Sequence, residues 1–236
     1  NPDLTKFYTF LIKTGYDTIL SNSQSFTIWA PINEALNEID TNNIDLLKKI
    51  VTNHIARSRI TTSGVENKII RMLNGKYLNF IKDGSDYYFS NCKVIMANNP
   101  AKNGLLHLVD SYAPYIDNIW EYIMNANEMD SLRYYILSQN KYIFDPINSI
   151  EIGVDSNGNV IYDSVLIYKN LFLEKIGKIN NEDSIYTAIL LNNNAWTEAY
   201  NKIKKYYNFP ENAGGISRQR EVTCYTIVKD ILFKGR

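Results

Sequence analysis

Apolar positions along the first third of the chain recur mainly at helical spacing and are interrupted by one short alternating segment. Residues 4–20 and 44–55 show the helical period, so the pattern predicts an amphipathic helix in each, the first with a break near Gly15. Residues 25–30 alternate aromatic or branched side chains with small ones, which is typical of a half-buried strand. The chain is therefore predicted to open as helix, strand and helix.

The segment SFTIWAPINEAL, residues 25–36, joins the predicted strand directly to a helix. Pro31 has no backbone N–H to donate to a longer ladder, so the strand is expected to end there. Asn33 can accept hydrogen bonds from the first free N–H groups of a helix, and Glu34 and Glu38 place negative charge near its positive end. We expect a strand, a proline break and a helix capped by Asn33.

Residues 75–99 differ in pattern, because short apolar runs alternate with turn residues. The sequence Lys-Asp-Gly-Ser at residues 82–85 lies between two such runs and predicts a hairpin loop. The segment NGLLHLVDSYAPY, residues 103–115, is expected to form a buried strand that ends at Pro114. These features predict a strand-rich second half for a first domain that spans residues 1–117.

Helical spacing returns at residues 119–137 and marks a second domain, residues 118–236. A hairpin is predicted around Asp-Ser-Asn-Gly at residues 155–158, followed by a strand and a helix within residues 185–203. Two isolated thiols, Cys92 and Cys224, fall in different domains and outside any Cys-x-x-Cys pair. This spacing favours partly buried cysteines over a zinc or redox site.

An internal duplication explains a likeness between the two domains. The matched positions are residues 33–36 with 193–196, Thr27 with Thr187, Glu38 with Glu198, and LKKIV at 47–51 with VKDIL at 228–232. Nothing after Leu232 corresponds to the strand-rich half of the first domain. Two explanations stay open, namely a chain cut short at Arg236 or a second sheet completed by strands within residues 150–168.

Composition narrows the classes of partner. The 25 basic and 25 acidic residues cancel, so no net charge attracts a nucleic-acid backbone or anionic lipid, and we expect no nucleic-acid partner. Hydrophobic residues make up 45% of the chain, which predicts an ordinary core. No apolar run approaches the roughly 20 residues of a membrane helix, so no transmembrane segment is expected in this chain.

The segments FTIWAPINEAL, LLKKIVTNHI and NGLLHLVDSYAP occur in this order and together resemble the fasciclin (FAS1) domain. The residues that carry the family pattern are Pro31, Asn33, Glu34, His54, Gly104, His107 and Asp110. The resemblance covers residues 1 to about 117 and continues more weakly in the second domain, where YTAILLNNNAW lacks the Ala-Pro pair. It implies an α+β fold, with a wedge or sandwich of strands beside several helices, in two tandem copies of which the second is divergent.

The resemblance also implies a location and a role. FAS1 domains serve adhesion or display outside cells, and the family pattern implies no cofactor. With its Asn and Ile bias, the chain is similar to secreted or cell-surface proteins of Bacteroidetes-type bacteria. Such proteins are often outer-membrane lipoproteins, and we expect a lipid anchor upstream of Asn1, where the chain begins without Met.

The two histidines are the strongest candidates for chemistry. His54 shares a face with apolar residues of its predicted helix, and His107 lies within the run LLHLV. Acid–base or metal chemistry would need clustered carboxylates, nucleophiles or further ligands, which the sequence does not offer. We therefore expect two buried, hydrogen-bonded imidazoles, with Asp110 as an acceptor, and we predict no catalytic, metal or cofactor residues.

Two further candidates, one aspartate and one set of aromatic residues, are expected to have structural roles. Asp155 fits the predicted hairpin turn better than a calcium loop. A second group of aromatic residues is expected to form the core stripe of the helical region and to fill the domain interface: Trp120, Tyr134, Tyr135 and Tyr142.

The leading hypothesis is a non-enzymatic adhesion module that binds surface proteins or polysaccharide. Its contacts would come from loops such as residues 98–104 and 210–220, since loops carry recognition while the scaffold stays rigid. One alternative is a secreted hydrolase of extracellular polymer with His54 or His107 as its base, and another is an architectural spacer. Enclosure of both imidazoles by apolar side chains would argue against the hydrolase.

Overall fold

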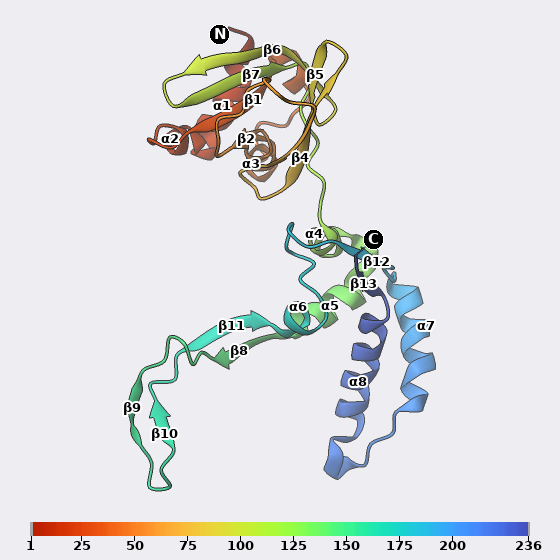
Figure 1. The fold of residues 1–236 in the computed structure, drawn as a ribbon. Helices are drawn as coiled ribbons and strands as arrows, with labels where there is room; N and C mark the ends of the chain where they lie inside the picture. The colour runs from red at the N-terminus through yellow and green to blue at the C-terminus, as the bar shows by residue number, and fades with distance from the viewer. Residues whose placement is uncertain (1, 236) are drawn as a thin grey trace. The chain divides into compact units, whose positions relative to one another are not determined.

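The chain folds into two units, residues 1–116, called unit 1, and residues 117–236, called unit 2 (Figure 1). The structure, a computed structural model, describes residues 2–235. No helix in this range is both long enough and apolar enough to cross a membrane.

Unit 1 is built around one seven-stranded sheet. Its helical elements are η1 (Pro2–Leu4), α1 (Thr5–Thr14), α2 (Tyr16–Leu20), η2 (Asn33–Leu36) and α3 (Ile44–Asn53). Its strands are β1 (Phe26–Pro31), β2 (Ile55–Ala56), β3 (Asn67–Arg71), β4 (Tyr77–Asp83), β5 (Asp86–Phe89), β6 (Cys92–Ala101) and β7 (Gly104–Val109). The strand order is β2-β1-β7-β6-β5-β4-β3, in which β1 and β7 are parallel and every other neighbouring pair is antiparallel. The predicted turn at residues 82–85 is confirmed as the β4–β5 connection.

Strand β1 separates two cores, because its side chains alternate between them. Trp29 joins strand residues such as Phe80 and Phe89 in one core, while Phe26 and Ala30 join residues of α1 and α3 in the other. The strand is therefore buried on both faces rather than half-buried as predicted. Burial on both faces fits its position inside the sheet, between β2 and its parallel neighbour β7.

The helix predicted after Pro31 is a single 3-10 turn, η2, and Asn33 does not cap it. Asn33 is the first residue of that turn, so its side chain is free to reach another helix. Its Oδ1 accepts from the Lys6 amide at 2.9 Å, and its Nδ2 donates to the Pro2 carbonyl at 2.8 Å and to Thr5 Oγ1 at 3.0 Å. Asn33 therefore caps α1, which lies 27 residues earlier and has no side-chain cap of its own.

Two predicted boundaries in unit 1 also move. The helix predicted to reach residue 55 ends at Asn53, and His54 follows it as the C-cap residue. Strand β7 ends at Val109, several residues before Pro114, because β6 pairs with it only as far as that residue.

Unit 2 combines helices with three separate two-stranded sheets. Its helical elements are α4 (Ile119–Asn125), η3 (Asn127–Met129), α5 (Asp130–Ser138), α6 (Leu171–Lys175), α7 (Asn193–Ile203), η4 (Lys204–Tyr206), η5 (Glu211–Ala213) and α8 (Gly215–Lys229). Its strands are β8 (Asn140–Phe144), β9 (Glu151–Val154), β10 (Val160–Tyr162), β11 (Leu166–Asn170), β12 (Tyr186–Ala188) and β13 (Leu232–Lys234). The pairs are β8–β11, β9–β10 and β12–β13, all antiparallel.

The strands within residues 150–168 do not complete a larger sheet, so that expectation is wrong. In residues 2–235, β9 and β10 pair with each other and β11 pairs with β8, and none of them pairs with β12 or β13. Figure 1 shows these four strands as an arm that extends from α5 and α6. The predicted Asp-Ser-Asn-Gly hairpin is confirmed at its tip, where Asp155 Oδ1 accepts from the amides of Asn157 and Asn159, each at 2.8 Å.

The helix predicted over residues 119–137 is interrupted. Ala126 is extended, with φ −73° and ψ 125°, and separates α4 from the η3–α5 segment. The Arg133 guanidinium donates to the carbonyl oxygens of Ile123, Met124 and Ala126, which satisfies the end of α4. Tyr134 and Tyr142 do not belong to the core, since 66% and 69% of their surfaces are exposed.

Candidate functional site

His54 is fully buried beside strand β1. Its Nδ1 lies 2.6 Å from the Trp29 carbonyl oxygen, and its Nε2 accepts from the Ala113 amide at 2.9 Å. Because a carbonyl can only accept, the proton is on Nδ1. Burial lowers the pKa of His54 to about 4, so the ring is neutral near pH 7. Backbone groups occupy both ring nitrogens, and neither is left for a substrate.

His107 is buried in the same way on β7. Its Nε2 donates to the Ile60 carbonyl at 2.9 Å, and its Nδ1 accepts from the Asn98 amide at 3.3 Å. Burial lowers the pKa of this imidazole as well. His107 therefore holds two segments, one before β3 and one in β6, against the central strands.

One of the two imidazoles, His107, joins Phe89 in enclosing Trp29 in an aromatic stack. The Trp29 ring lies between Phe89, at 4.5 Å and 7° between planes, and His107, at 5.4 Å and 10°. Phe80 meets the same indole edge to face at 5.6 Å. Among the described residues, Trp29 Nε1 is the one buried side-chain nitrogen or oxygen without a hydrogen-bond partner. Ring contacts therefore hold this indole in place without help from its N–H group.

Asp110 does not contact either histidine, so its expected role as their acceptor is wrong. Its carboxylate is exposed and accepts from the Lys93 amide at 2.9 Å and from Ser111 Oγ at 2.8 Å. A histidine acceptor is not needed, because backbone carbonyls already receive both imidazole protons. Asp110 instead joins the ends of β6 and β7.

The other family-pattern residues shape the backbone. Pro31 ends β1 opposite Val109, whose carbonyl accepts from the next amide, that of Ile32, at 3.1 Å. A Cβ on Gly104 would lie 2.0 Å from the Phe26 carbonyl oxygen, so only glycine allows β7 to approach β1 this closely. Glu34 lies in η2 with an exposed side chain.

Cys92 and Cys224 are both buried and free, in different units. Burial raises the pKa of the Cys92 thiol to about 11, and burial also raises the pKa of Cys224. Within residues 2–235, no group of three or more His, Cys, Asp or Glu side chains could hold a metal ion.

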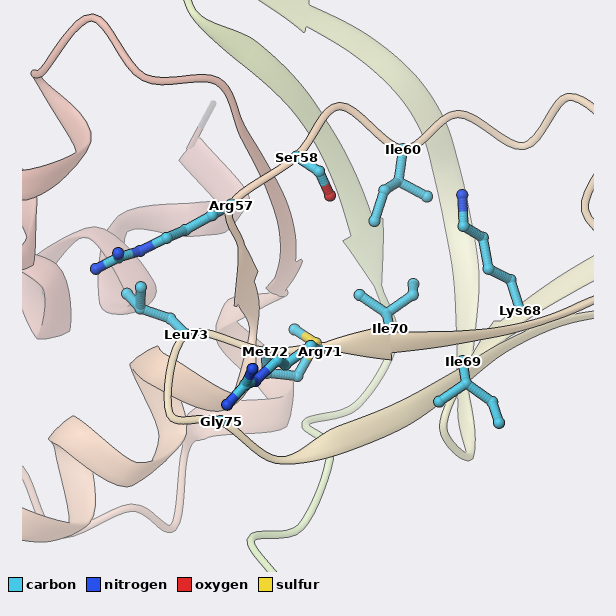
Figure 2. Close-up of a pocket in the computed structure, with 10 residues that line it drawn as sticks. All are labelled: Arg57, Ser58, Ile60, Lys68, Ile69, Ile70, Arg71, Met72, Leu73 and Gly75. Atoms are coloured by element: carbon cyan, nitrogen blue, oxygen red, sulfur yellow. The ribbon is translucent and has the colours of Figure 1, made fainter. Parts of the chain in front are cut away.

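Unit 1 also contains an opening that the sequence did not indicate. The sheet has two outer strands, β2 and β3. Within residues 2–235, one backbone hydrogen bond links these two edges, from the Leu73 amide to the Ile55 carbonyl at 2.7 Å. Beyond that bond the chain that follows β2 separates from β3 and leaves a hollow of about 540 Å³, which we call the seam. Figure 2 shows Ser58 and Ile60 on one side and Ile70 on the other, with their side chains directed into it.

The seam has an apolar floor and a basic rim. Its floor contains the buried core residues Ile60, Ile70 and Met72. Its rim carries three exposed cations, Arg57, Lys68 and Arg71, and its lining contains no Asp or Glu. A hydrophobic floor under a positively charged rim is suited to an extended, negatively charged ligand.

Unit 2 has a wider hollow, of about 840 Å³, among α5, α7 and α8. Tyr134, Trp196 and Tyr200 line it together with the oppositely charged Arg220 and Glu221. The expected contact segments are not loops throughout, since residues 98–101 lie in β6 and residues 215–220 lie in α8. Periodicity did not reveal either hollow, because each is formed by residues that are distant in sequence.

Comparisons with known proteins assign unit 1. Residues 2–113 match the family model described as Fasciclin domain, so this part of the chain is a fasciclin domain. Fasciclin domains occur in extracellular and cell-surface proteins, where they are generally involved in adhesion. The chain thus contains a domain of an adhesive class.

One protein of known sequence and one solved structure are similar to this chain. "Protein sll1483" of Synechocystis sp. is 32% identical over 101 residues, which are 39% of this chain and 56% of that protein, so the match spans about half of the relative. A solved structure is described as "Novel Fold Revealed by the Structure of a FAS1 Domain Pair from the Insect Cell Adhesion Molecule Fasciclin I". It is 17% identical with a TM-score of 0.40, and the match covers 100% of this chain and 74% of that one. A TM-score this low does not assign unit 2.

Proposed function

We propose that the chain is a non-enzymatic, extracellular surface module that binds surface proteins or polysaccharide. The observation that carries this proposal is the state of the two histidines in a fasciclin domain. Backbone groups engage all four ring nitrogens, both rings are fully buried, and burial lowers the pKa of each. A general base needs an accessible nitrogen near its substrate. These imidazoles instead act as internal struts.

We also propose that unit 2 is a second, divergent copy of the start of unit 1. Asn193, the counterpart of Asn33, repeats its capping role: its Oδ1 accepts from the Ser131 amide at 2.9 Å. Ser131 is the second residue of α5, as Lys6 is the second residue of α1. Both asparagines also donate to the side chain of the first residue of that helix. Two long-range caps with the same geometry support a common origin.

The strand pairing supports the same proposal. In unit 1, β1 and β2 pair as Thr27 with Ala56, and in unit 2, β12 and β13 pair as Thr187 with Phe233. The bond from the Trp29 amide to the His54 carbonyl is likewise repeated by Ile189 and Ile231, at 2.8 Å. This register corrects one expected match: VKDIL runs from the end of α8 into β13, whereas LKKIV lies wholly in α3. Ile231 therefore replaces the histidine strut.

A binding screen of the full chain tests the main proposal. The protein would be presented to arrays of bacterial and host polysaccharides and of extracellular matrix proteins, with release of reducing sugars and peptides measured in parallel. We expect saturable binding to at least one surface component and no product release. Steady product release that survives repurification would establish the hydrolase instead, and silence in both arrays would favour a spacer.

We further propose display at a bacterial surface through a lipid anchor. Membership of unit 1 in a class of cell-surface domains supports this location. Metabolic labelling of the producing cells with an alkyne fatty acid, followed by recovery of the protein, should give a labelled band in the membrane fraction. A wholly unlabelled protein in the culture medium would show that the module is secreted.

A further inference from the structure

We propose that the seam of unit 1 binds an extended acidic segment of a partner protein, which adds as a β-strand to the free edge of β3. This inference rests on the proposed binding function and specifies a partner class for it. It depends on three properties of the described residues around the seam: backbone groups that lack a neighbouring strand, a charge conflict between the two edges, and an apolar floor.

The exposed edge of β3 presents backbone groups to the seam. The Met72 amide donates to the Lys76 carbonyl, on the side of β4. The next amide, that of Leu73, points the other way and donates to the Ile55 carbonyl of β2. Because backbone groups alternate in direction along a strand, the N–H and C=O groups of Ile69 and Arg71 point to the same side as those of Leu73. No strand pairs with that side of β3 in residues 2–235. An incoming extended peptide can therefore form a ladder there.

The charges on the two edges explain why the seam stays open. β2 and β3 run antiparallel, so continuing the register from the Leu73–Ile55 bond would place Arg71 opposite Arg57. Like charges directly opposite each other destabilise a strand pair. Within the described chain, no carboxylate forms an ion pair with Arg57 or Lys68. An acidic strand between the edges would turn this repulsion into attraction.

The side-chain pattern of the ligand follows from the two faces of the seam. Side chains of an added strand would alternate between the core and the rim. Those facing inward would cover Ile60, Ile70 and Met72, so they should be apolar, and those facing outward would meet the arginines, so they should be acidic. The geometry thus points to a segment in which Val, Ile or Leu alternates with Asp or Glu.

A labelled peptide of five Glu-Val repeats, capped at both ends, is the direct probe. Its affinity for the full chain would be measured by fluorescence anisotropy at 50 mM and 500 mM NaCl, beside a five-repeat Lys-Val peptide. We expect saturable binding of the acidic peptide only, weakened at high salt because the charges are exposed. Hydrogen exchange followed by NMR should show new protection at the Ile69 and Arg71 amides, which a purely electrostatic contact would not produce.

Three variants localise the interaction. Arg57→Glu and Arg71→Glu should each raise the Kd about tenfold, as loss and reversal of a rim charge predict. Lys102→Glu makes the same change in net charge at an exposed position outside the seam and should leave the Kd unchanged. Equal Tm values for the three variants establish that each is folded. An N-methylated Glu-Val peptide, which cannot donate to the ladder, should bind at least about tenfold more weakly than the parent.

Two results would overturn the proposal. Equal binding of polygalacturonate and peptide, without amide protection, would show a general polyanion patch, and no peptide binding at millimolar concentration would show that the seam is not a strand site. The screen of surface components separates these failures from failure of the proposed function. If the wild type and the Arg57→Glu variant bind a surface component equally, the proposed binding function stands. Only the proposal that the seam is the binding site is then rejected.

Discussion

Trp29 and His54 hold each other through two reciprocal hydrogen bonds. The Trp29 amide donates to the His54 carbonyl oxygen at 3.0 Å, and His54 Nδ1 donates to the Trp29 carbonyl oxygen, 2.6 Å away. The imidazole thereby takes the place that a backbone N–H would occupy in a strand ladder. A residue that ends α3 is thus tied to strand β1 by both its backbone and its side chain.

Replacement of His54 by Ala should destabilise unit 1 by about 3 kcal/mol. The change leaves the Trp29 carbonyl and the Ala113 amide unpaired in a dry site and opens a cavity beside them. Urea unfolding measures the loss, and hydrogen exchange along β1 assigns it to unit 1. Lys48→Ala, on the exposed side of α3, should change the unfolding free energy by less than about 0.5 kcal/mol. A His54→Ala loss as small as the Lys48 value would contradict the strut role.

Unit 1 should lose stability on mild acidification. Burial lowers the folded-state pKa of His54 to about 4, below the unfolded value of about 6.5, so the unfolded chain binds more protons between these values. The contribution of neutral His54 to the free energy of unfolding is constant above pH 6.5. It falls as the pH decreases toward 4, by roughly 3 kcal/mol in all. His107, whose pKa burial also lowers, adds to the same trend.

Unfolding free energies at several values between pH 7.5 and 4.5 check this prediction. The double variant His54→Gln with His107→Gln has no imidazole to titrate and should show a markedly flatter profile, whatever its stability at pH 7.5. An unchanged slope in that variant would assign the acid sensitivity to other groups. Asp145 and Asp155 are poor candidates for this window, because hydrogen bonds lower the pKa of each below the usual carboxyl range.

Several elements follow directly from local sequence. The period of residues 44–53 and the cap by Asn43 determine α3, and the Asp-Gly pair at residues 83–84 determines the β4–β5 turn. The burial of His54 and His107 also follows from their apolar neighbours. In each case the signal lies within about ten residues of the element that it specifies.

The features that sequence reasoning missed depend on contacts between distant residues. The residues around Asn33 predict that it caps the helix that follows it. In the structure it instead caps α1, where it accepts from an amide 27 residues earlier. The sequence predicts Asp110 as the acceptor for a histidine. In the structure the Trp29 carbonyl accepts the proton of His54 and the Ile60 carbonyl accepts that of His107. The seam exists only where two sheet edges separate, and one-dimensional patterns contain no information on which edges meet.

Replacement of Asn33 by Ala should cost about 1 kcal/mol, as expected for loss of a helix N-cap. The cost arises in α1, because the Lys6 amide loses its acceptor, so faster hydrogen exchange in the first turn of α1 accompanies the loss. Asn33→Asp keeps an acceptor and should recover part of the stability. Glu34→Ala is the matched neighbour and should be nearly neutral. Faster exchange in η2 instead of α1 would restore the local capping interpretation.

Asn193→Ala tests whether the second cap is equivalent. The Ser131 amide loses its acceptor, so we expect a loss of about 1 kcal/mol that appears in α5. Hydrogen exchange of the full chain distinguishes this from the Asn33 effect, since the two helices belong to different units. Loss of protection confined to α7, where Asn193 itself lies, would argue against a repeated capping device.

Gly104→Ala should be among the most damaging single-methyl changes in the chain. The new Cβ would lie 2.0 Å from the Phe26 carbonyl oxygen and 2.9 Å from its carbonyl carbon, and a backbone atom in a central strand cannot move aside cheaply. We expect a loss of about 3 kcal/mol or more, seen as a lower urea midpoint. Gly153→Ala in β9 adds the same methyl with no atom within 4 Å and should be neutral or slightly stabilising. Equal midpoints for the two variants would show that β1 and β7 approach less closely than the structure describes.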